Sequence, residues 1–198
     1  TRMRYIRKRA APQELSRWIK GQRDADGQYI NCRYENIPTE IKEQIRRQLL
    51  LEQGWLCCYT GMGIERNTSH IEHLKPQATF WQNREDVDYH NLLAAYPGDK
   101  MRVKFGAQAK DKWYNPVLMV SPLHKSCETR FRFNLSGQIR IANSNDAAAK
   151  ETIKRLHLDD PSLDEMREHA IHEALFPDDE HLSKAQIAKV AQNFCIPD

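Results

Sequence analysis

The chain has 198 residues, 40% of them hydrophobic and 29% charged, with a net charge of +3. This composition predicts one water-soluble globular domain, and no run approaches the roughly 18 apolar residues of a membrane span. No signal-peptide pattern opens the chain, and the odd number of cysteines lacks the spacing of a disulfide framework. We therefore expect reduced thiols and a cytoplasmic location.

Basic residues gather near the amino end. Residues 1–50 carry twelve Lys and Arg against six Asp and Glu, whereas residues 151–198 carry five against eleven. Residues 2–10 hold five basic side chains around Tyr5 and Ile6, which predicts an arm that lies along phosphates; a disordered terminus is the alternative. We expect the basic front to contact nucleic acid and the acidic tail to be solvated charge.

The first third of the chain predicts two helices and a turn. Pro12 begins a helix that ends at Gly21. A second helix is predicted over residues 39–53, where Thr39 can cap and apolar residues recur at Ile41, Ile45 and Leu49. Residues 55–63 then predict a strand and a knuckle-like turn. Structural zinc is not expected there, because the adjacent Cys57 and Cys58 cannot easily share one tetrahedral ion.

Residues 69–76 hold the densest cluster of chemistry-bearing side chains. His70 and His73 flank Glu72 within four residues, and Pro76 forces a turn after them. A carboxylate suits a hard divalent cation, and an imidazole beside it can act as a general base near neutral pH. This is the chemistry of a phosphodiester-cutting site, and two surface histidines near a glutamate are the alternative.

A polar loop is predicted over residues 77–88, and a short apolar run over 89–96 reads as a strand or the start of a helix. Asn91 lies where the chain would return to the first strand, and its amide can bridge backbone groups across the loop. The basic stretch 100–112 is predicted to contact phosphate or to form a solvated helix face.

The carboxyl-terminal part predicts a β-hairpin and helices. Two short strands flank a turn at Leu135-Ser136-Gly137. Ser162 and Glu165 are spaced as a capping box. The strands are expected at residues 130–133 and 138–141, and the helices at 147–158, 162–175 and 183–194.

Two motifs resemble the core of HNH (ββα-metal) endonucleases: Ile71-Glu72-His73 with Pro76, and His90-Asn91-Leu92-Leu93. The order of further features, among them the basic arm, Asn115-Pro116 and the hairpin, resembles the PtuB-like HNH effectors of Septu and retron antiphage defence systems. The resemblance implies an α+β fold. An amino-terminal basic arm and helices (1–54) would precede the HNH nuclease core (55–112), and a hairpin and helical region (113–198) would follow it.

The resemblance also implies roles for single residues. His73 would be the general base, Glu72 a metal ligand, and Asn91 the residue that keeps the metal-binding loop in shape. His70 and His90 are the other candidate metal ligands, and the ion would be Mg²⁺ or Mn²⁺. Nucleic acid would be contacted by Arg4, Lys75, Lys100 and Lys110.

Two positions depart from the family pattern. Relatives carry four cysteines around a zinc ion, whereas here only Cys57 remains and the other three positions hold Thr60, Tyr96 and Gly106. We expect that site to be lost, with aromatic packing of Trp55, Tyr96 and Phe105 in its place. The last HNH residue aligns with Ala107, and its substitute would be Asp99, Gln108 or Asp111.

The expected function is a metal-dependent HNH endonuclease that cuts DNA as a defence effector. The resemblance implies control by an ABC/SMC-like (PtuA-like) ATPase within a hetero-oligomer. An RNA-cleaving effector, acting for example on transfer RNA, is one alternative. A degenerate HNH module that binds nucleic acid or a partner without cutting is the other.

Overall fold

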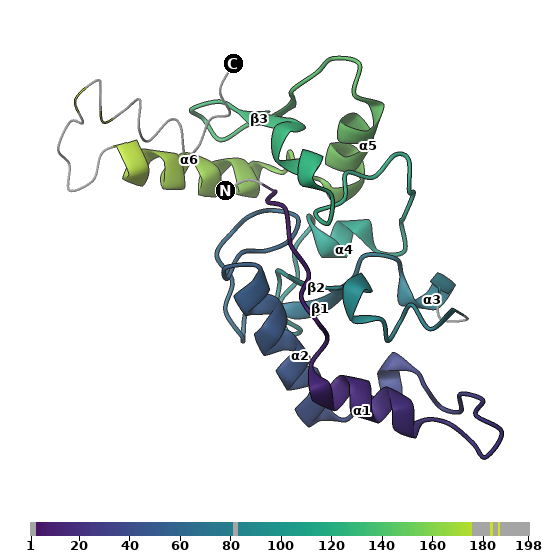
Figure 1. Ribbon diagram of the computed structural model, residues 1–198. Coiled ribbons are helices and arrows are strands. Elements are labelled where there is room, and N and C mark those ends of the chain that lie inside the picture. The colour runs from purple at the N-terminus through teal and green to yellow at the C-terminus, as the bar shows by residue number, and fades with distance from the viewer. Residues whose placement is uncertain (1–2, 81–82, 176–182, 184–185, 187–198) are drawn as a thin grey trace.

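The computed structural model describes residues 3–80, 83–175, 183 and 186, which form the mixed α+β fold expected from the sequence (Figure 1). The first half contains α1 (Gln13–Gly21), η1 (Tyr34–Asn36), α2 (Thr39–Glu52), β1 (His70–His73) and α3 (Gln77–Phe80). The second half contains η3 (Tyr89–Asn91), β2 (Leu92–Ala95), α4 (Ala107–Lys110), η4 (Lys125–Thr129), β3 (Phe131–Phe133), β4 (Ile139–Ile141), α5 (Ala147–Leu156) and α6 (Pro161–Leu175).

The centre of the fold is the antiparallel pair β1 and β2. His70 faces Ala95 and His73 faces Leu92 across the pair. Leu92 to Ala95 are all fully buried, so both faces of β2 are covered, and the short apolar run is a strand, not the start of a helix. The four-residue α4 follows, which completes the order strand, strand, helix along the chain.

Helix α2 packs on this pair through its apolar face. Ile45, Leu49 and Leu50 are fully buried, and the side-chain amide of Gln53 bonds to both the N–H and the carbonyl of Ala94 in β2. The predicted cap is wrong: Pro38 occupies the N-cap position and no side chain caps the helix. Proline suits this end because the first N–H groups of a helix have no intrahelical partner.

The expected strand at residues 55–63 is reduced to one bridge between Leu56 and Gly63 around a tight turn. Within the turn, the N–H of Cys57 donates to Met62 and the N–H of Gly61 donates to Cys57. The turn is tied to β2 by a bond from Cys58 N–H to Ala94 O.

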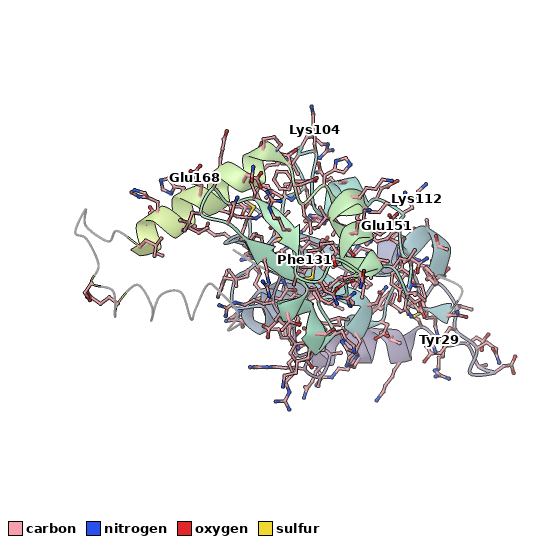
Figure 2. The ribbon with its side chains drawn as sticks, turned by 90° about the horizontal axis from the view of Figure 1, so that it is seen from above. Tyr29, Lys104, Lys112, Phe131, Glu151 and Glu168 are labelled. Carbon is pink, nitrogen blue, oxygen red and sulfur yellow. The ribbon has the colours of Figure 1, made fainter. Side chains whose placement is uncertain are left out.

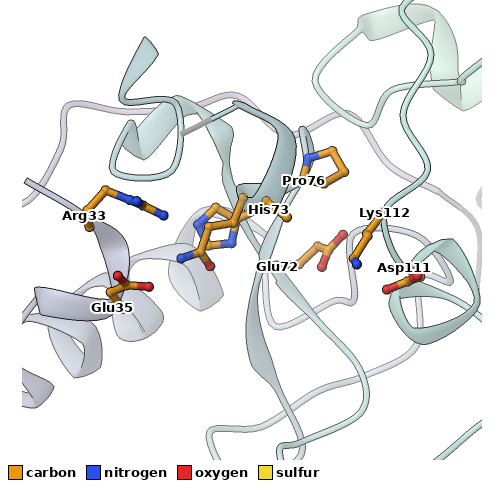
Figure 3. Close-up of a pocket in the computed structure, with 9 residues that line it drawn as sticks. Arg33, Glu35, Glu72, His73, Pro76, Asp111 and Lys112 are labelled. Carbon is orange, nitrogen blue, oxygen red and sulfur yellow. The ribbon is translucent and has the colours of Figure 1, made fainter. Parts of the chain in front are cut away.

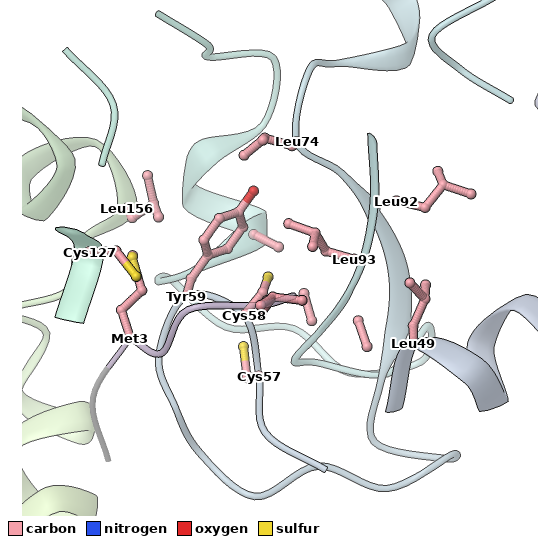
Figure 4. Close-up of a cluster of buried hydrophobic side chains, with 14 of the residues drawn as sticks. Met3, Leu49, Cys57, Cys58, Tyr59, Leu74, Leu92, Leu93, Cys127 and Leu156 are labelled. Carbon is pink, nitrogen blue, oxygen red and sulfur yellow. The ribbon is translucent and has the colours of Figure 1, made fainter. Parts of the chain in front are cut away.

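Residues 3–10 are docked on the domain rather than forming a disordered tail. In Figure 1 this segment runs past β1 and β2 to α1. Met3 and Ile6 are buried, and the Lys8 ammonium lies 3.0 Å from the buried Glu52 carboxylate of α2. Figure 4 shows Met3 close to Cys127 and Tyr59, so the arm joins both halves of the core.

The β3–β4 hairpin, α5 and α6 form near their predicted positions, with Phe131 opposite Ile141. The buried Arg167 of α6 donates to the carbonyls of Gly137 and Leu158, which holds this helix against the hairpin. The predicted capping box is not used, since the N–H of Ser162 donates to the Asp160 side chain. The predicted helix 183–194 lies outside the described residues, apart from positions 183 and 186. No described helix has the length and apolar character needed to cross a membrane.

Candidate active site

Glu72 and His73 lie at the end of β1 on the wall of a pocket of about 400 Å³. Figure 3 shows them between Arg33 on one side and Asp111 and Lys112 on the other. The pocket is therefore built from segments far apart in the sequence. Its lining consists of Arg33, Glu35, Glu72, His73, Pro76, Gln77, Ala78, Asp111 and Lys112.

The His73 imidazole is held in one orientation. Its Nε2 lies 2.9 Å from the carbonyl oxygen of Asp86, and the Tyr34 ring packs nearly perpendicular to it, with 4.5 Å between the ring centroids. A carbonyl can only accept, so Nε2 carries the proton and Nδ1 keeps its lone pair in the neutral ring. Burial lowers the pKa of His73 despite the bond to Asp86 and the nearby carboxylates. The ring is thus a neutral base at physiological pH.

Asn91 closes the loop that follows His73, as the sequence predicted. Its Oδ1 accepts the N–H of Lys75 at 2.8 Å, and its Nδ2 donates to the carbonyls of Lys75 and Glu85 at 3.0 and 2.8 Å. The Lys75 ammonium also pairs with the Glu85 carboxylate at 2.7 Å. These contacts fix the end of the loop that carries Asp86. They therefore also fix the hydrogen bond between Asp86 and His73.

The two carboxylate oxygens of Glu72 have different partners. Oε1 accepts from the hydroxyl of Tyr59 at 3.1 Å and from the ammonium of Lys110 at 2.8 Å. Oε2 faces Nε2 of His70 at 3.7 Å. Burial would raise the pKa of Glu72, but His70 and Lys110 outweigh it and leave that pKa lowered. Glu72 is therefore ionised, with one oxygen committed to protein donors.

His70 and Glu72 fit two ligands of one divalent ion. The 3.7 Å between Nε2 and Oε2 is too long for a hydrogen bond. Two ligands that each lie about 2.1 Å from one ion stand roughly 3 to 3.5 Å apart, so only a small closure is needed. Nδ1 of His70 bonds to the carbonyl of Pro97, the outer contact typical of metal-binding histidines. Without an ion, burial is outweighed by Glu72 and Pro97, and the pKa of His70 is raised.

The predicted ligand His90 is not part of this group. It is exposed, and its Nδ1 lies 3.4 Å from Asp88 on the outer side of η3. This part of the predicted ligand set is wrong because the η3 turn directs the ring to solvent. Over residues 3–80, 83–175, 183 and 186, no group of three or more His, Cys, Asp or Glu is placed to hold a metal ion.

The three proposed substitutes for the last HNH residue differ in position. Ala107 is buried at the start of α4. Asp99 pairs with Arg46, and the Gln108 side chain bonds to the backbone of residues 101 and 103. Asp111 lines the pocket with Glu72. Of these side chains, Asp111 is the one placed to approach an ion or a phosphate there.

Lys110 does not face a nucleic-acid backbone, so this prediction is wrong. Its side chain is 1% exposed and points inward, because α4 turns it onto β1, where it binds Glu72 and the carbonyl of His73. Arg4 and Lys100 are exposed, as a phosphate contact requires, and Lys75 is half-buried against Glu85.

Arg33 and Tyr59 were missed from the sequence. Arg33 lies in a stretch that reads only as loop, and Tyr59 in a turn. Lys112 belongs to the basic stretch 100–112, for which the sequence predicted a phosphate contact or a solvated helix face, and it lines the pocket. Figure 2 shows Lys112 and Lys104 extending outward from the surface.

The four positions aligned with zinc cysteines lie together in space. The sulfur of Cys57 accepts from Tyr96 N–H at 3.3 Å. A Cβ on Gly106 would lie 3.6 Å from Thr60 Cγ2 and 3.9 Å from Tyr96 O. The Tyr96 and Phe105 rings stack at 6.1 Å between centroids, as expected, whereas Trp55 is 45% exposed and the prediction that it packs there is wrong.

No model of a known protein family matches the chain, and no curated protein compared with it matches either. The geometry of the site is therefore the basis for a functional proposal.

Proposed function

We propose that the protein is a metal-dependent endonuclease of the HNH (ββα-metal) type. The observation that carries this proposal is the His73 imidazole, fixed by Asp86 with Nδ1 unprotonated, on the wall of the same pocket as the ionised Glu72. A neutral base next to a carboxylate in an accessible pocket suits hydrolysis of a phosphodiester.

The order of β1, β2 and α4, with Asn91 closing the loop, supports the same family. So does the clustering of Cys57, Thr60, Tyr96 and Gly106, since these positions span about 50 residues of sequence yet meet at one place.

In the proposed reaction, Nδ1 of His73 takes a proton from water, which attacks the phosphorus in line with the leaving oxygen. Glu72 and His70 would hold the divalent ion, which supplies charge stabilisation to the phosphate and the leaving oxygen. Arg33 and Lys112 at the pocket edge attract the phosphate backbone. Asn91 acts indirectly by keeping the Asp86 carbonyl in contact with His73.

The biological setting proposed from the resemblance is antiphage defence. In this setting the endonuclease is the effector of a hetero-oligomer and is controlled by an ABC/SMC-like ATPase. The acidic carboxyl-terminal region, with five Lys and Arg against eleven Asp and Glu in residues 151–198, is the proposed docking surface for it. DNA is the proposed substrate, and structured RNA is the alternative because phosphate contacts are alike in both.

The test is a cleavage assay of the purified chain on plasmid DNA and total RNA with Mg²⁺ or Mn²⁺, without and then with the ATPase. His73→Ala should lower the rate by about 10²- to 10⁴-fold, the usual contribution of a general base. His90→Ala is the matched control and should cut like the parent chain, because His90 lies outside the pocket.

Equal cutting by His73→Ala would refute the assignment of the base. No cutting and no metal binding under any condition would favour the non-catalytic binding module. Ala107 in place of a polar ligand and the Lys110–Glu72 ion pair are the features that favour this second candidate.

A further inference from the structure

The pair formed by Glu72 and Lys110 has a consequence for how the site takes up its ion. We propose that Lys110 makes divalent-cation binding conditional on a phosphate of the nucleic acid. Lys110 balances the charge of Glu72, so the protein alone holds the ion weakly and the bound substrate supplies the missing negative charge. This inference rests on the proposed nuclease function.

Lys110 is built into the site as a fixed cation. Its Nζ lies 2.8 Å from Oε1 of Glu72 and 3.0 Å from the carbonyl oxygen of His73, and the side chain is 1% exposed. A buried ammonium with two acceptors cannot turn away to solvent without depriving the buried Glu72 carboxylate of its ion pair with a lysine, which is costly. Its positive charge therefore stays next to the carboxylate.

The same contacts leave the other oxygen of Glu72 for an ion. Tyr59 and Lys110 both bond to Oε1, whereas Oε2 faces His70. An ion held by Oε2 and the neutral imidazole of His70 would therefore sit on a carboxylate whose charge is already balanced. Two positive groups on one carboxylate repel each other, and the repulsion is strong where water is excluded.

Other charged side chains line the pocket: Arg33 and Lys112 are positive, Glu35 and Asp111 are negative, and Arg33 is already paired with the buried Asp86 carboxylate at 3.2 Å. Divalent ions bind strongly where several carboxylates converge, and the carboxylate that faces His70 is already neutralised by Lys110. A phosphate oxygen can coordinate an ion, and it also brings negative charge into such a pocket.

The consequence is that ion and nucleic acid bind cooperatively. Each should raise the affinity of the other by the same factor, as linkage requires. Without nucleic acid, the nuclease would then bind little metal. The metal site would be complete only when a nucleic-acid strand is bound.

The first arm of the test measures Mn²⁺ binding to the full chain by the loss of the free-ion paramagnetic resonance signal. A His73→Ala background slows cleavage enough for a binding measurement, and a 20-base-pair DNA duplex is present or absent. The duplex should tighten Mn²⁺ binding by about tenfold or more, the effect of one added charge near an ion. The controls are the duplex without protein and the Glu72→Gln variant with duplex. Neither should show the tight Mn²⁺ binding.

The second arm removes the fixed charge. Lys110→Met should tighten Mn²⁺ binding about tenfold or more without any duplex, by the same charge argument. Lys154→Met, an exposed lysine on α5, changes the net charge equally and should leave Mn²⁺ affinity unchanged. Adding Glu72→Gln to Lys110→Met should abolish the gain.

The outcomes separate the two proposals. Equal Mn²⁺ affinity with and without duplex, in a chain that cleaves with metal, would overturn the role of Lys110 and leave the nuclease standing. No Mn²⁺ binding in any arm together with no cleavage would overturn the nuclease itself. If Lys110→Met fails to fold, Lys110→Gln, which removes the charge but keeps a hydrogen-bond donor for Glu72 and the carbonyl of His73, takes its place.

Discussion

Replacing Asn91 with alanine tests how the loop after β1 holds the base. The substitution removes three hydrogen bonds, to the N–H and carbonyl of Lys75 and to the carbonyl of Glu85, at 2.8, 3.0 and 2.8 Å. Each such bond contributes about 1 kcal/mol net, so the free energy of unfolding should fall by roughly 3 kcal/mol.

Loss of these hydrogen bonds should also lower the cleavage rate. The carbonyl of Asp86 that fixes His73 follows Glu85 directly, so a loosened loop releases the imidazole. Cleavage should therefore fall by at least about tenfold even at a temperature where the chain stays folded, because misplaced catalytic groups lose rate steeply.

Urea unfolding followed by tryptophan fluorescence measures the stability, and the plasmid assay measures the rate. Asn134→Ala is the matched control, because this exposed asparagine bonds to Gln138 within the hairpin and its loss should cost no more than about 1 kcal/mol. A loss below about 1 kcal/mol for Asn91→Ala, with unchanged cleavage, would refute the reasoning.

Three further predictions concern the arm, the hairpin and the base. Lys8→Met should cost about 3 kcal/mol in urea unfolding, because it leaves the 1% exposed Glu52 carboxylate without its ion pair. Gly137→Ala should cost about 3 kcal/mol, because φ is +72° and the new Cβ would lie 2.0 Å from the Asp164 carbonyl oxygen. Cleavage should be half-maximal below pH 6.5 in single-turnover pH profiles, since burial lowers the pKa of His73 and only the neutral ring accepts a proton.

Each of these three predictions has a control variant or a result that would contradict it. Arg7→Met changes an exposed neighbour in the arm and should stay within about 0.5 kcal/mol of the parent chain. Gly27→Ala has a similar φ of +76° but its nearest neighbour, on Arg23, is 4.0 Å away, so it should cost only about 1 kcal/mol. A half-maximal point above pH 7 would contradict the assignment of the base to His73.

The parts of the fold that were predictable depend on local patterns. The helix over 39–53 follows from apolar residues every four positions, and the hairpin follows from two short runs around Gly137. Asn91 was predictable as a loop bridge because an amide can both donate and accept. The cap at Thr39 was wrong because Pro38 occupies the N-cap position and Thr39 is already the first residue of the helix.

The sequence by itself determined which chemistry the protein carries: a carboxylate and an imidazole in adjacent positions, followed by an asparagine that can close their loop. Only the tertiary structure decided how these groups are surrounded. Packing of α4 on β1 turned Lys110 inward onto Glu72, η3 turned His90 outward, and the pocket brought Arg33 to the same wall. Side-chain identity is local, whereas direction and burial depend on contacts between segments tens of residues apart.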